Sequence, residues 1–227
     1  MKIHAYTIAY DTGFAPCIAN NELTLACCKS NLRYKIGEEL LKNPNENIYL
    51  FALCGKGLSK ERKLEEEYFY SPLYIAKITD AVGTNEYFSI LENGRRDQVY
   101  YCDENGEWNS LINNPHRKPA EKFNPVDEVN KDILYMPRKT SEPKLNYILK
   151  SSDYIYFGNN LTMRKELPKS VNKICEKLEK ACRLNPMIVY TSEEEGEFIT
   201  WYKKLKRTKT QAEKTDSTGS CCRIYKK

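Results

Sequence analysis

An uninterrupted apolar segment is the feature of this sequence that most restricts its fold. Residues 47–54 read Asn-Ile-Tyr-Leu-Phe-Ala-Leu-Cys and are followed by Gly55-Lys56-Gly57. A short apolar run without polar alternation, closed by glycines, is typical of a strand buried on both faces of a sheet. The glycine segment is either a simple turn or a backbone contact for a phosphate. It lacks the spacing of a P-loop or a dinucleotide fingerprint, which favours the turn.

Three further segments predict strands beside this central one. Residues 2–10 are rich in β-branched and aromatic types, and a turn containing Asp, Gly and Pro follows at residues 11–16. Residues 22–29 alternate between an apolar face and a face of small, partly polar side chains. Residues 73–79 form another apolar run. The first half of the chain is therefore expected to build a sheet.

The last third of the sequence predicts two amphipathic helices. Apolar residues recur at spacings of three, four and seven from Val171 to Cys182, which predicts a helix over 170–183. Ser192 and Glu195 form a capping box that begins a second helix. Strands at the front and helices at the back predict an α+β fold, in which a small curled sheet or barrel carries the C-terminal helices packed on it.

The middle of the chain and its C-terminal end are less regular. Residues 85–91 predict a short helix and residues 98–102 a strand, whereas residues 113–143 contain five prolines and many charges. We expect the following organisation: a single α+β domain over 1–207, a loop-rich insertion within it around 103–143, and a basic flexible tail at 208–227.

The net charge of +5 is concentrated at the C-terminal end. Residues 203–227 contain nine basic and two acidic residues, so this segment carries +7 and residues 1–202 carry −2. A basic tail raises the affinity for nucleic acid through counterion release, although a solvated terminus is the more common role. No apolar run approaches the ~20 residues of a membrane span and no signal peptide opens the sequence. We therefore expect a soluble, cytoplasmic protein.

The nine cysteines indicate reduced thiols, because their number is odd and no export signal accompanies them. No Cys-x-x-Cys pair is present, and His4 and His116 are the only histidines, so a zinc site is not expected. The sequence also lacks a P-loop, a nucleophile elbow and a cofactor fingerprint. The residues therefore name neither a metal nor a cofactor.

Two segments near the N-terminus resemble a known family. Tyr10–Pro16 reads Tyr-Asp-Thr-Gly-Phe-Ala-Pro, and Leu23–Lys29 reads Leu-Thr-Leu-Ala-Cys-Cys-Lys, with Arg33 shortly after it. These segments are similar to the opening of the second nucleotide-modification-associated domain family, whose members share Asp-x-Gly-Phe-Ala-Pro, Thr-Leu-Ala-x-Cys-Lys and a following arginine. Weaker similarities continue in the family's order to about residue 205: Asp97–Tyr100, Ile148–Ser151, Tyr156–Gly158, Leu167-Pro168 and Phe198–Trp201.

The resemblance implies a role connected with modified bases. The family is known mainly from its association with genes for modified bases, often in phages and bacteria. Its opening is also similar to PUA-like small barrels, which include modules that bind an extruded or modified base, although a fold alone does not establish a function. Members usually have a turn and a strand after the arginine. Gly37 can keep this turn here, but the residues after it depart from the family's pattern.

Asp11 is the residue on which the functional interpretation depends most. At the mouth of a pocket, its carboxylate would accept hydrogen bonds from a base edge or act as a general base. As a turn residue it would instead bond to neighbouring backbone amides, and turn statistics favour this second role. The resemblance brings the two interpretations to equal weight.

Cys28 is the other candidate for catalysis, because the neighbouring Lys29 can lower the pKa of its thiol. Adjacent strand residues point to opposite faces, however, and no partner histidine is evident. Thr24 shares the Cys28 face, where small side chains leave room for a planar ligand or for close packing. Tyr156 and Phe157 can stack on a base, although such aromatics more often belong to the core. The expected ligand-binding residues are Tyr10, Asp11, Gly13, Phe14, Thr24, Cys28, Lys29, Arg33, Tyr156 and Phe157.

Three functions fit these residues. We favour a nucleotide- or nucleic-acid-base-binding protein whose pocket is built from the N-terminal strands, with the basic tail holding phosphates. Arg95-Arg96 is either a further phosphate contact or an exposed turn. The second function is a transferase-like enzyme that modifies a nucleotide or a DNA base, with Asp11 or Cys28 as general base or nucleophile. The third is a protein-interaction factor that uses residues 113–143 and the tail.

Overall fold

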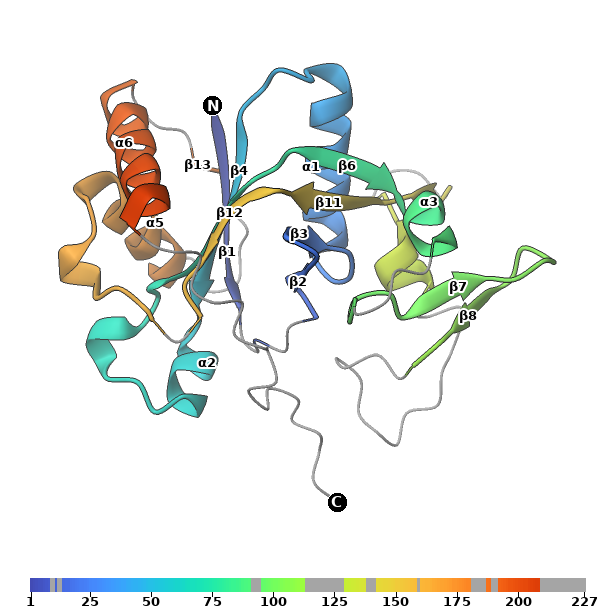
Figure 1. Cartoon of the computed structure of the whole chain (residues 1–227), viewed down its shortest axis with the longest axis horizontal. Coiled ribbons are helices and arrows are strands. Elements are labelled where there is room, and N and C mark those ends of the chain that lie inside the picture. Colours follow the sequence, from blue (N-terminus) through green and yellow to red (C-terminus); the bar gives the residue numbers. More distant parts are fainter. Residues whose placement is uncertain are drawn as a thin grey trace. The chain divides into compact units, whose positions relative to one another are not determined.

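The computed structural model of the chain describes residues 1–8, 11, 14–90, 95–112, 129–137, 142–158, 160–180, 187–188 and 192–208. These residues divide into two compact units, whose helices and strands are labelled in Figure 1. The first unit contains Met1–Asp11, Glu46–Ile78 and, of the C-terminal residues, 153–208; the second contains Thr12–Asn45 and Thr79–Ser152. Each unit is therefore assembled from segments that alternate along the chain.

A five-stranded sheet forms the first unit. Its strands lie in the order β12 (Asp153–Tyr156), β5 (Pro72–Lys77), β4 (Ile48–Cys54), β1 (Lys2–Ile8) and β13 (Met187–Ile188). β1 and β4 are parallel, and the other neighbours are antiparallel. Every residue of β4 is buried, which confirms the central strand that its apolar run predicts. The strands expected at the start of the chain and near residue 73 are confirmed as β1 and β5.

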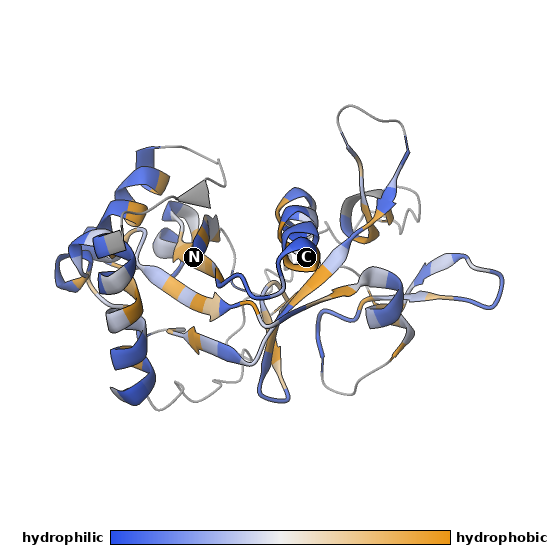
Figure 2. Ribbon diagram, turned by 90° about the horizontal axis from the view of Figure 1, so that it is seen from above, coloured by the Kyte–Doolittle hydropathy of each residue, from blue (hydrophilic) through white to orange (hydrophobic). Residues whose placement is uncertain are grey.

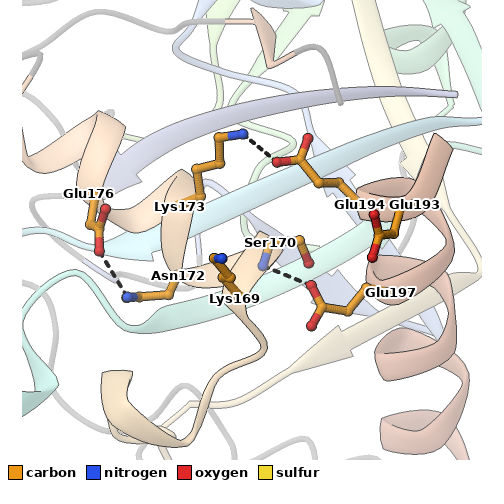
Figure 3. A pocket seen from close by; sticks show the side chains of 8 residues that line it. All are labelled: Lys169, Ser170, Asn172, Lys173, Glu176, Glu193, Glu194 and Glu197. Carbon is orange, nitrogen blue, oxygen red and sulfur yellow. Dashed lines mark hydrogen bonds and ion pairs between the residues drawn. The ribbon is translucent and has the colours of Figure 1, made fainter. Parts of the chain in front are cut away.

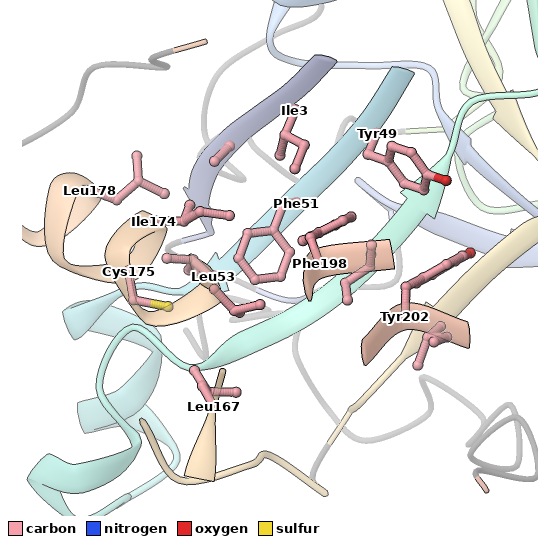
Figure 4. Close-up of a cluster of buried hydrophobic side chains, with 14 of the residues drawn as sticks. Ile3, Tyr49, Phe51, Leu53, Leu167, Ile174, Cys175, Leu178, Phe198 and Tyr202 are labelled. Atoms are coloured by element: carbon pink, nitrogen blue, oxygen red, sulfur yellow. The ribbon is translucent and has the colours of Figure 1, made fainter. Parts of the chain in front are cut away.

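Two helices cover one face of this sheet. α5 (Lys169–Lys180) and α6 (Ser192–Thr208) place their apolar side chains among those of β1, β4 and β5, as Figure 4 shows. The Phe198 ring lies edge-on to the rings of Tyr49 and Phe51, with centroid distances of 5.4 and 6.3 Å. A fully buried side chain of this kind contributes about 1.5–3 kcal/mol. Both predicted C-terminal helices are confirmed. The described residues of the unit also contain the helical turns α2 (Lys56–Glu61), η1 (Glu66–Tyr68) and η3 (Arg164–Glu166).

The opposite face of the same sheet is rich in tyrosine. Side chains alternate along a strand, and Ile3 and Ala5 of β1 belong to the helix-covered core, so Tyr6 points to the other face. The pairing register places one residue from each of four strands in a single row: Tyr6, Ala52, Tyr74 and Tyr156. Tyr156, at one end of this row, contacts Asp11, which is described in the next subsection.

The second unit contains a four-stranded antiparallel sheet in the order β2 (Cys17–Ala19), β3 (Glu22–Leu25), β11 (Tyr147–Ser151) and β6 (Asp80–Gly83). Two hairpins accompany it: β7 (Tyr100–Cys102) with β8 (Trp108–Ser110), and β9 (Leu134–Tyr135) with β10 (Lys144–Leu145). Among the described residues of this unit, the helical segments are α1 (Ser30–Lys42), α3 (Thr84–Ser89) and the π-turn η2 (Val129–Ile133). The short helix and the strand predicted over 85–91 and 98–102 are confirmed as α3 and β7.

Two expectations about the start of the second unit are wrong. The strand predicted over 22–29 ends at Leu25, because Cys28 and Lys29 have positive φ angles of 65° and 50°, and α1 begins immediately afterwards. Gly37 lies inside this helix and not in a turn. A Cβ atom on Gly37 would lie 2.2 Å from the ring of Tyr147, so glycine allows α1 to pack closely on β11.

The described residues confirm an α+β protein with its C-terminal helices packed on a sheet. Each of their sheets has a linear strand order and none closes, so they do not form the small barrel expected from the PUA-like analogy. Figure 2 shows hydrophobic and hydrophilic segments alternating along the helices, as expected of helices that bury one face. Within the described part of the chain, no helix has the length and apolar character needed to cross a membrane.

Candidate ligand-binding site

One edge of the sheet in the first unit gathers polar side chains from several strands. β1 and β4 are parallel and both end at this edge, and the antiparallel pairings bring the start of β5 and the end of β12 to it. Asp11 follows β1, Tyr74 lies near the start of β5, and Tyr156 ends β12. In open α/β sheets, ligands commonly bind beyond the carboxyl ends of the strands. This edge is therefore a favourable place for a site.

Asp11 is buried at this edge and is held by two side chains. Its Oδ2 atom accepts a hydrogen bond from Nη2 of Arg62 at 2.6 Å and another from the hydroxyl of Tyr156. Arg62 also donates from Nη1 to the carbonyl oxygen of Gly158 at 2.7 Å. Both contacts of Asp11 use the same oxygen, and Oδ1 makes no hydrogen bond within the described residues. We call Asp11, Arg62 and Tyr156 the Asp11 cluster.

The electrostatics of the Asp11 cluster keep its donors protonated. Burial raises the pKa of Tyr156, and the Asp11 carboxylate raises it further. Burial alone would lower the pKa of Arg62, but its interactions with Asp11 and Tyr156 outweigh burial and the pKa is raised. At neutral pH the cluster therefore consists of a guanidinium cation and a neutral phenol, both directed at one carboxylate oxygen.

Two further phenols lie in the same row of the sheet. The hydroxyls of Tyr6 and Tyr74 are hydrogen-bonded to each other, and their rings meet edge-on with centroids 6.1 Å apart. The small side chain of Ala52 lies between them in the register, which leaves room for this contact. Burial raises the pKa of Tyr74, the hydrogen bond from Tyr6 lowers it, and Asp11 raises it. Asp11 is thus electrostatically coupled to a phenol that it does not touch.

The glycine segment after β4 serves to position Arg62. The N–H of Gly55 donates to the carbonyl oxygen of Ile8 at 2.9 Å, and a Cβ atom at this position would lie 2.8 Å from that oxygen. Glycine therefore allows the chain to leave β4 close to the end of β1. The short helix α2 follows and ends just before Arg62. The sequence alone gives no signal for Arg62, which lies in a charged segment.

Thr24 belongs to a buried network in the second unit. Its Oγ1 atom contacts the carboxylate of Asp97 and accepts a hydrogen bond from Nη2 of Arg95 at 2.8 Å. Nε of Arg95 donates to the hydroxyl of Tyr87, which donates to Asp97, both at 2.9 Å. Because Arg95 is buried in this network, it is neither the exposed turn nor the open phosphate contact that the sequence suggests.

Arg33 holds together three segments of the second unit. Its guanidinium is fully buried and donates to the carbonyl oxygens of Cys28, Tyr147 and Asp132, at 2.8 Å in the case of Cys28. The Asp132 carboxylate in turn accepts the N–H of Cys28 at 3.0 Å and the hydroxyl of Tyr100 at 2.7 Å. These contacts give Arg33 and Asp132 a structural role around the loop at Cys28.

The environment of Cys28 is unsuited to a thiolate nucleophile. Burial, together with the Asp132 carboxylate, raises the pKa of this thiol to about 12 despite the lowering effects of Arg33 and Lys29. The pKa of Lys29 is lowered by its own burial. At neutral pH the Cys28 side chain is therefore a neutral thiol, which is the opposite of the activation that its lysine neighbour suggests.

The remaining candidates from the sequence have different locations. Phe157 and Phe14 are fully buried in the apolar cores of the first and second unit, respectively. Tyr10 and Gly13 lie outside the described residues. The cysteines that the structure describes are all free thiols. Within the described residues, no group of three His, Cys, Asp or Glu side chains is arranged to hold a metal ion. Asp11 and Tyr156 are thus the two predicted residues that the first unit brings into contact.

A groove between α5 and α6 offers a different kind of surface, shown in Figure 3. Lys173 pairs with Glu194 across it, and Glu197 accepts the backbone N–H of Ser170 at 2.8 Å. The groove contains no aromatic side chain and none of the predicted site residues. Its lining residues are Lys169, Ser170, Asn172, Lys173, Glu176, Glu193, Glu194 and Glu197. The internal ion pair and capping contact identify it as part of the helix–helix packing.

Comparison with protein families identifies the chain. Residues 1–218 match the model of the nucleotide modification associated domain 2 family. The chain belongs to this family. Comparison with curated proteins and with solved structures gives no significant match. The name of the nucleotide modification associated domain 2 family connects the chain with nucleotide modification. The match also extends beyond residue 205, into the segment that the sequence analysis assigned to a separate tail.

Proposed function

We propose that this protein binds a nucleotide or a nucleobase at the Asp11 cluster, as part of nucleotide modification. One observation supports this most strongly. Asp11 is 5% exposed, and its Oδ2 atom is bound by two donors, Arg62 and Tyr156, that lie far from it in the sequence. An Asx-turn by itself needs only nearby backbone amides, and it does not require a guanidinium and a phenol from distant segments. The geometry resembles a fixed acceptor prepared for a ligand.

A nucleobase supplies the donor that this acceptor requires. Exocyclic amino groups and ring N–H groups of bases donate hydrogen bonds, and carboxylates accept them, as in recognition of the cytosine amino group. Arg62 compensates the charge of Asp11, so a neutral base can bind without leaving an uncompensated buried anion. The two donors also fix the carboxylate before binding, which reduces the ordering cost of association.

Three parts of the proposal rest on the sequence: the recognition of an extruded base, the location in the cytoplasm, and the roles of Tyr10 and Gly13. Recognition of a base that has been extruded from a strand is an analogy to PUA-like modules and does not depend on a barrel. A location in the cytoplasm agrees with the free thiols of the described cysteines. The sequence motif around Asp11 would contribute Tyr10 and Gly13 to the same site.

A transferase-like enzyme is the second candidate function. The hydroxyl pair of Tyr6 and Tyr74 lies in the same row as Tyr156, which is bound to Asp11. Phenols next to a carboxylate can relay a proton, and Asp11 would then act as the general base. Substrate turnover that disappears in Asp11→Asn, while binding is retained, would favour this candidate over a binding module.

The proposed function is tested with two tyrosine variants from the same strand. Tyr156→Phe removes a donor to Asp11, whereas Tyr154→Phe removes a buried hydroxyl that has no hydrogen-bond partner within the described residues. Nucleobases, nucleoside monophosphates and oligonucleotides with modified bases are titrated into both variants and the wild-type chain. Without this donor the Asp11 carboxylate is less firmly fixed before binding, so Tyr156→Phe should weaken binding by up to about tenfold.

The control variant Tyr154→Phe should bind as tightly as the wild-type chain. It should also be at least as stable, because it removes an unsatisfied polar group. The proposal is wrong if the wild-type chain binds none of these compounds, or if the two variants lose affinity equally.

A further inference from the structure

The C-terminal end of α6, the orange-red helix in Figure 1, carries an uncompensated group of positive charges. Residues 203–208 read Lys-Lys-Leu-Lys-Arg-Thr and contain no acidic residue. Lys206 forms an ion pair with Asp153. The side chains of Lys203, Lys204 and Arg207 are exposed and make no hydrogen bond or ion pair within the described residues. We call these three residues the α6 basic face.

The side chains of the α6 basic face point in similar directions. Residues spaced by three and four positions lie next to each other on a helix surface, so Arg207 is a neighbour of both Lys203 and Lys204. Like charges at these spacings destabilise a helix. The face therefore has an electrostatic cost in the free protein, and a polyanion lying across it would relieve that cost.

The helix dipole does not account for this arrangement. Cations are favourable at a helix C-terminus, but the effect falls off within the last turn. Lys203 and Lys204 lie before the last turn of α6, which ends at Thr208. The end of α5 provides a comparison within the same unit, since its last residues, Cys175–Lys180, contain Lys177 and Lys180 together with Glu176 and Glu179. That helix end is locally neutral, and the end of α6 is not.

We propose that the α6 basic face binds the phosphate backbone of a nucleic acid strand. The inference deepens the proposed function, because it assigns the base recognised at the Asp11 cluster to a polymer and not to a free nucleotide. Successive phosphates along a strand are the repeated anions that three neighbouring cations can contact together, whereas a mononucleotide offers one phosphate group. The contact releases counterions and makes the affinity depend on salt.

The experiment compares two double variants of the full chain. Lys203→Gln with Lys204→Gln removes two charges from the α6 basic face, and Lys177→Gln with Lys180→Gln removes two exposed charges from the end of α5. Affinity for a single-stranded and a double-stranded oligonucleotide is measured over a series of salt concentrations. Melting temperatures of both variants confirm that they are folded.

The expected result is specific to the first variant. Each lost phosphate contact lowers the slope of log affinity against log salt by about 0.9 for a duplex and about 0.7 for a single strand, so the slope should fall by about 1.8 or 1.4. The α5 variant should keep the wild-type slope. Equal slopes in all three proteins, equal changes in both variants, or no oligonucleotide binding at low salt would each overturn the inference. Binding to anionic vesicles or to an acidic peptide in place of oligonucleotides would also overturn it.

The result is separable from the test of the Asp11 cluster. The Lys203 and Lys204 variant should bind a mononucleotide as the wild-type chain does, because the Asp11 cluster is unchanged in it. A failure of mononucleotide binding in the wild-type chain concerns the proposed function, whereas an unchanged salt slope concerns the α6 basic face.

Discussion

Among single residues, the proposed site depends most on how the Asp11 carboxylate is held. The motif around Asp11 predicts a functional residue, and the aromatic pair at the end of β12 predicts Tyr156, but the sequence does not show that they meet. They are 145 positions apart, and the pairings of β12 with β5, of β5 with β4 and of β4 with β1 bring the end of β12 and the end of β1 to the same side of the sheet. Arg62 completes the arrangement and has no sequence signal, since an arginine in a charged surface segment is ordinary. The chemistry of the site is therefore only partly readable from the sequence.

The protonation of Cys28 leads to a prediction about stability at alkaline pH. The folded chain keeps this thiol protonated, with a pKa of about 12, whereas the unfolded chain ionises it above pH ~8.5. The unfolded state then binds fewer protons, so the free energy of unfolding should decrease as the pH rises from about 9 towards 12. Cys28→Ser should make this decrease shallower in urea unfolding series from pH 8 to pH 10.

The exposed thiol of Cys102 provides the control for this measurement. Cys102→Ser should leave the pH dependence of the unfolding free energy unchanged. A Cys28→Ser protein with the same alkaline slope as the wild-type chain would show that the thiol is not held protonated by the fold.

Among helices and strands, the sequence predicts correctly those whose buried side chains recur with the period of the helix or fill every position of a central strand. β4 is apolar at every position, and α5 buries Val171, Ile174, Cys175 and Leu178 at helical spacing. α1 was not predicted because its buried face contains Arg33 and Gly37 beside Leu32 and Ile36. The buried face of α1 is hard to predict because arginine and glycine are not typical core residues. Here Arg33 donates to three carbonyl oxygens, and Gly37 leaves room for the ring of Tyr147. Very short strands such as β13 carry too few residues to show a period.

The close packing of α1 predicts opposite stability effects for alanine substitutions at two helical glycines, Gly37 and Gly196. Gly37→Ala should destabilise the chain by about 1–3 kcal/mol, because its Cβ atom would overlap the ring of Tyr147. Gly196→Ala in α6 should instead stabilise the chain by about 0.5–1 kcal/mol, because no atom lies within 4 Å of the added Cβ and alanine favours the helix. Urea unfolding of both variants measures the two effects. Equal effects of the same sign would contradict the close approach of α1 and β11.

At the scale of the whole molecule, the two units draw alternating segments from the chain. The sequence predicts one domain over 1–207 and gives no signal for this division, because no linker of distinct composition separates the units. Ser152 alone connects β11 of the second unit to β12 of the first, and residues 78–79 connect β5 to β6. Boundaries of this kind arise from which strands pair, which depends on contacts distant in the sequence.

The C-terminal segment leads to a prediction about the limits of the folded chain. Residues 209–227 are mostly polar and basic, so a chain that ends at Thr208 should keep the melting temperature of the full chain. If the segment contacts nucleic acid, the same truncation should reduce the salt dependence of oligonucleotide affinity. A clear fall in melting temperature would mean that the family match up to residue 218 reflects packed structure.

The central claim is that Asp11 presents an acceptor to a base, and the most direct measurement compares Asp11→Asn with Asp103→Asn. Asp103 is a turn carboxylate whose Oδ1 accepts the backbone N–H groups of Asn105 and Glu107, so its substitution controls for the loss of an Asx-turn charge. Base and mononucleotide affinity is measured by calorimetry well below the melting temperature of each variant, because Asp11→Asn also weakens the contact with Arg62. We predict at least a tenfold loss of affinity in Asp11→Asn, because a charged hydrogen bond to the ligand of about 1.5–3 kcal/mol is lost, and wild-type affinity in Asp103→Asn. Wild-type affinity in a folded Asp11→Asn protein would contradict this claim.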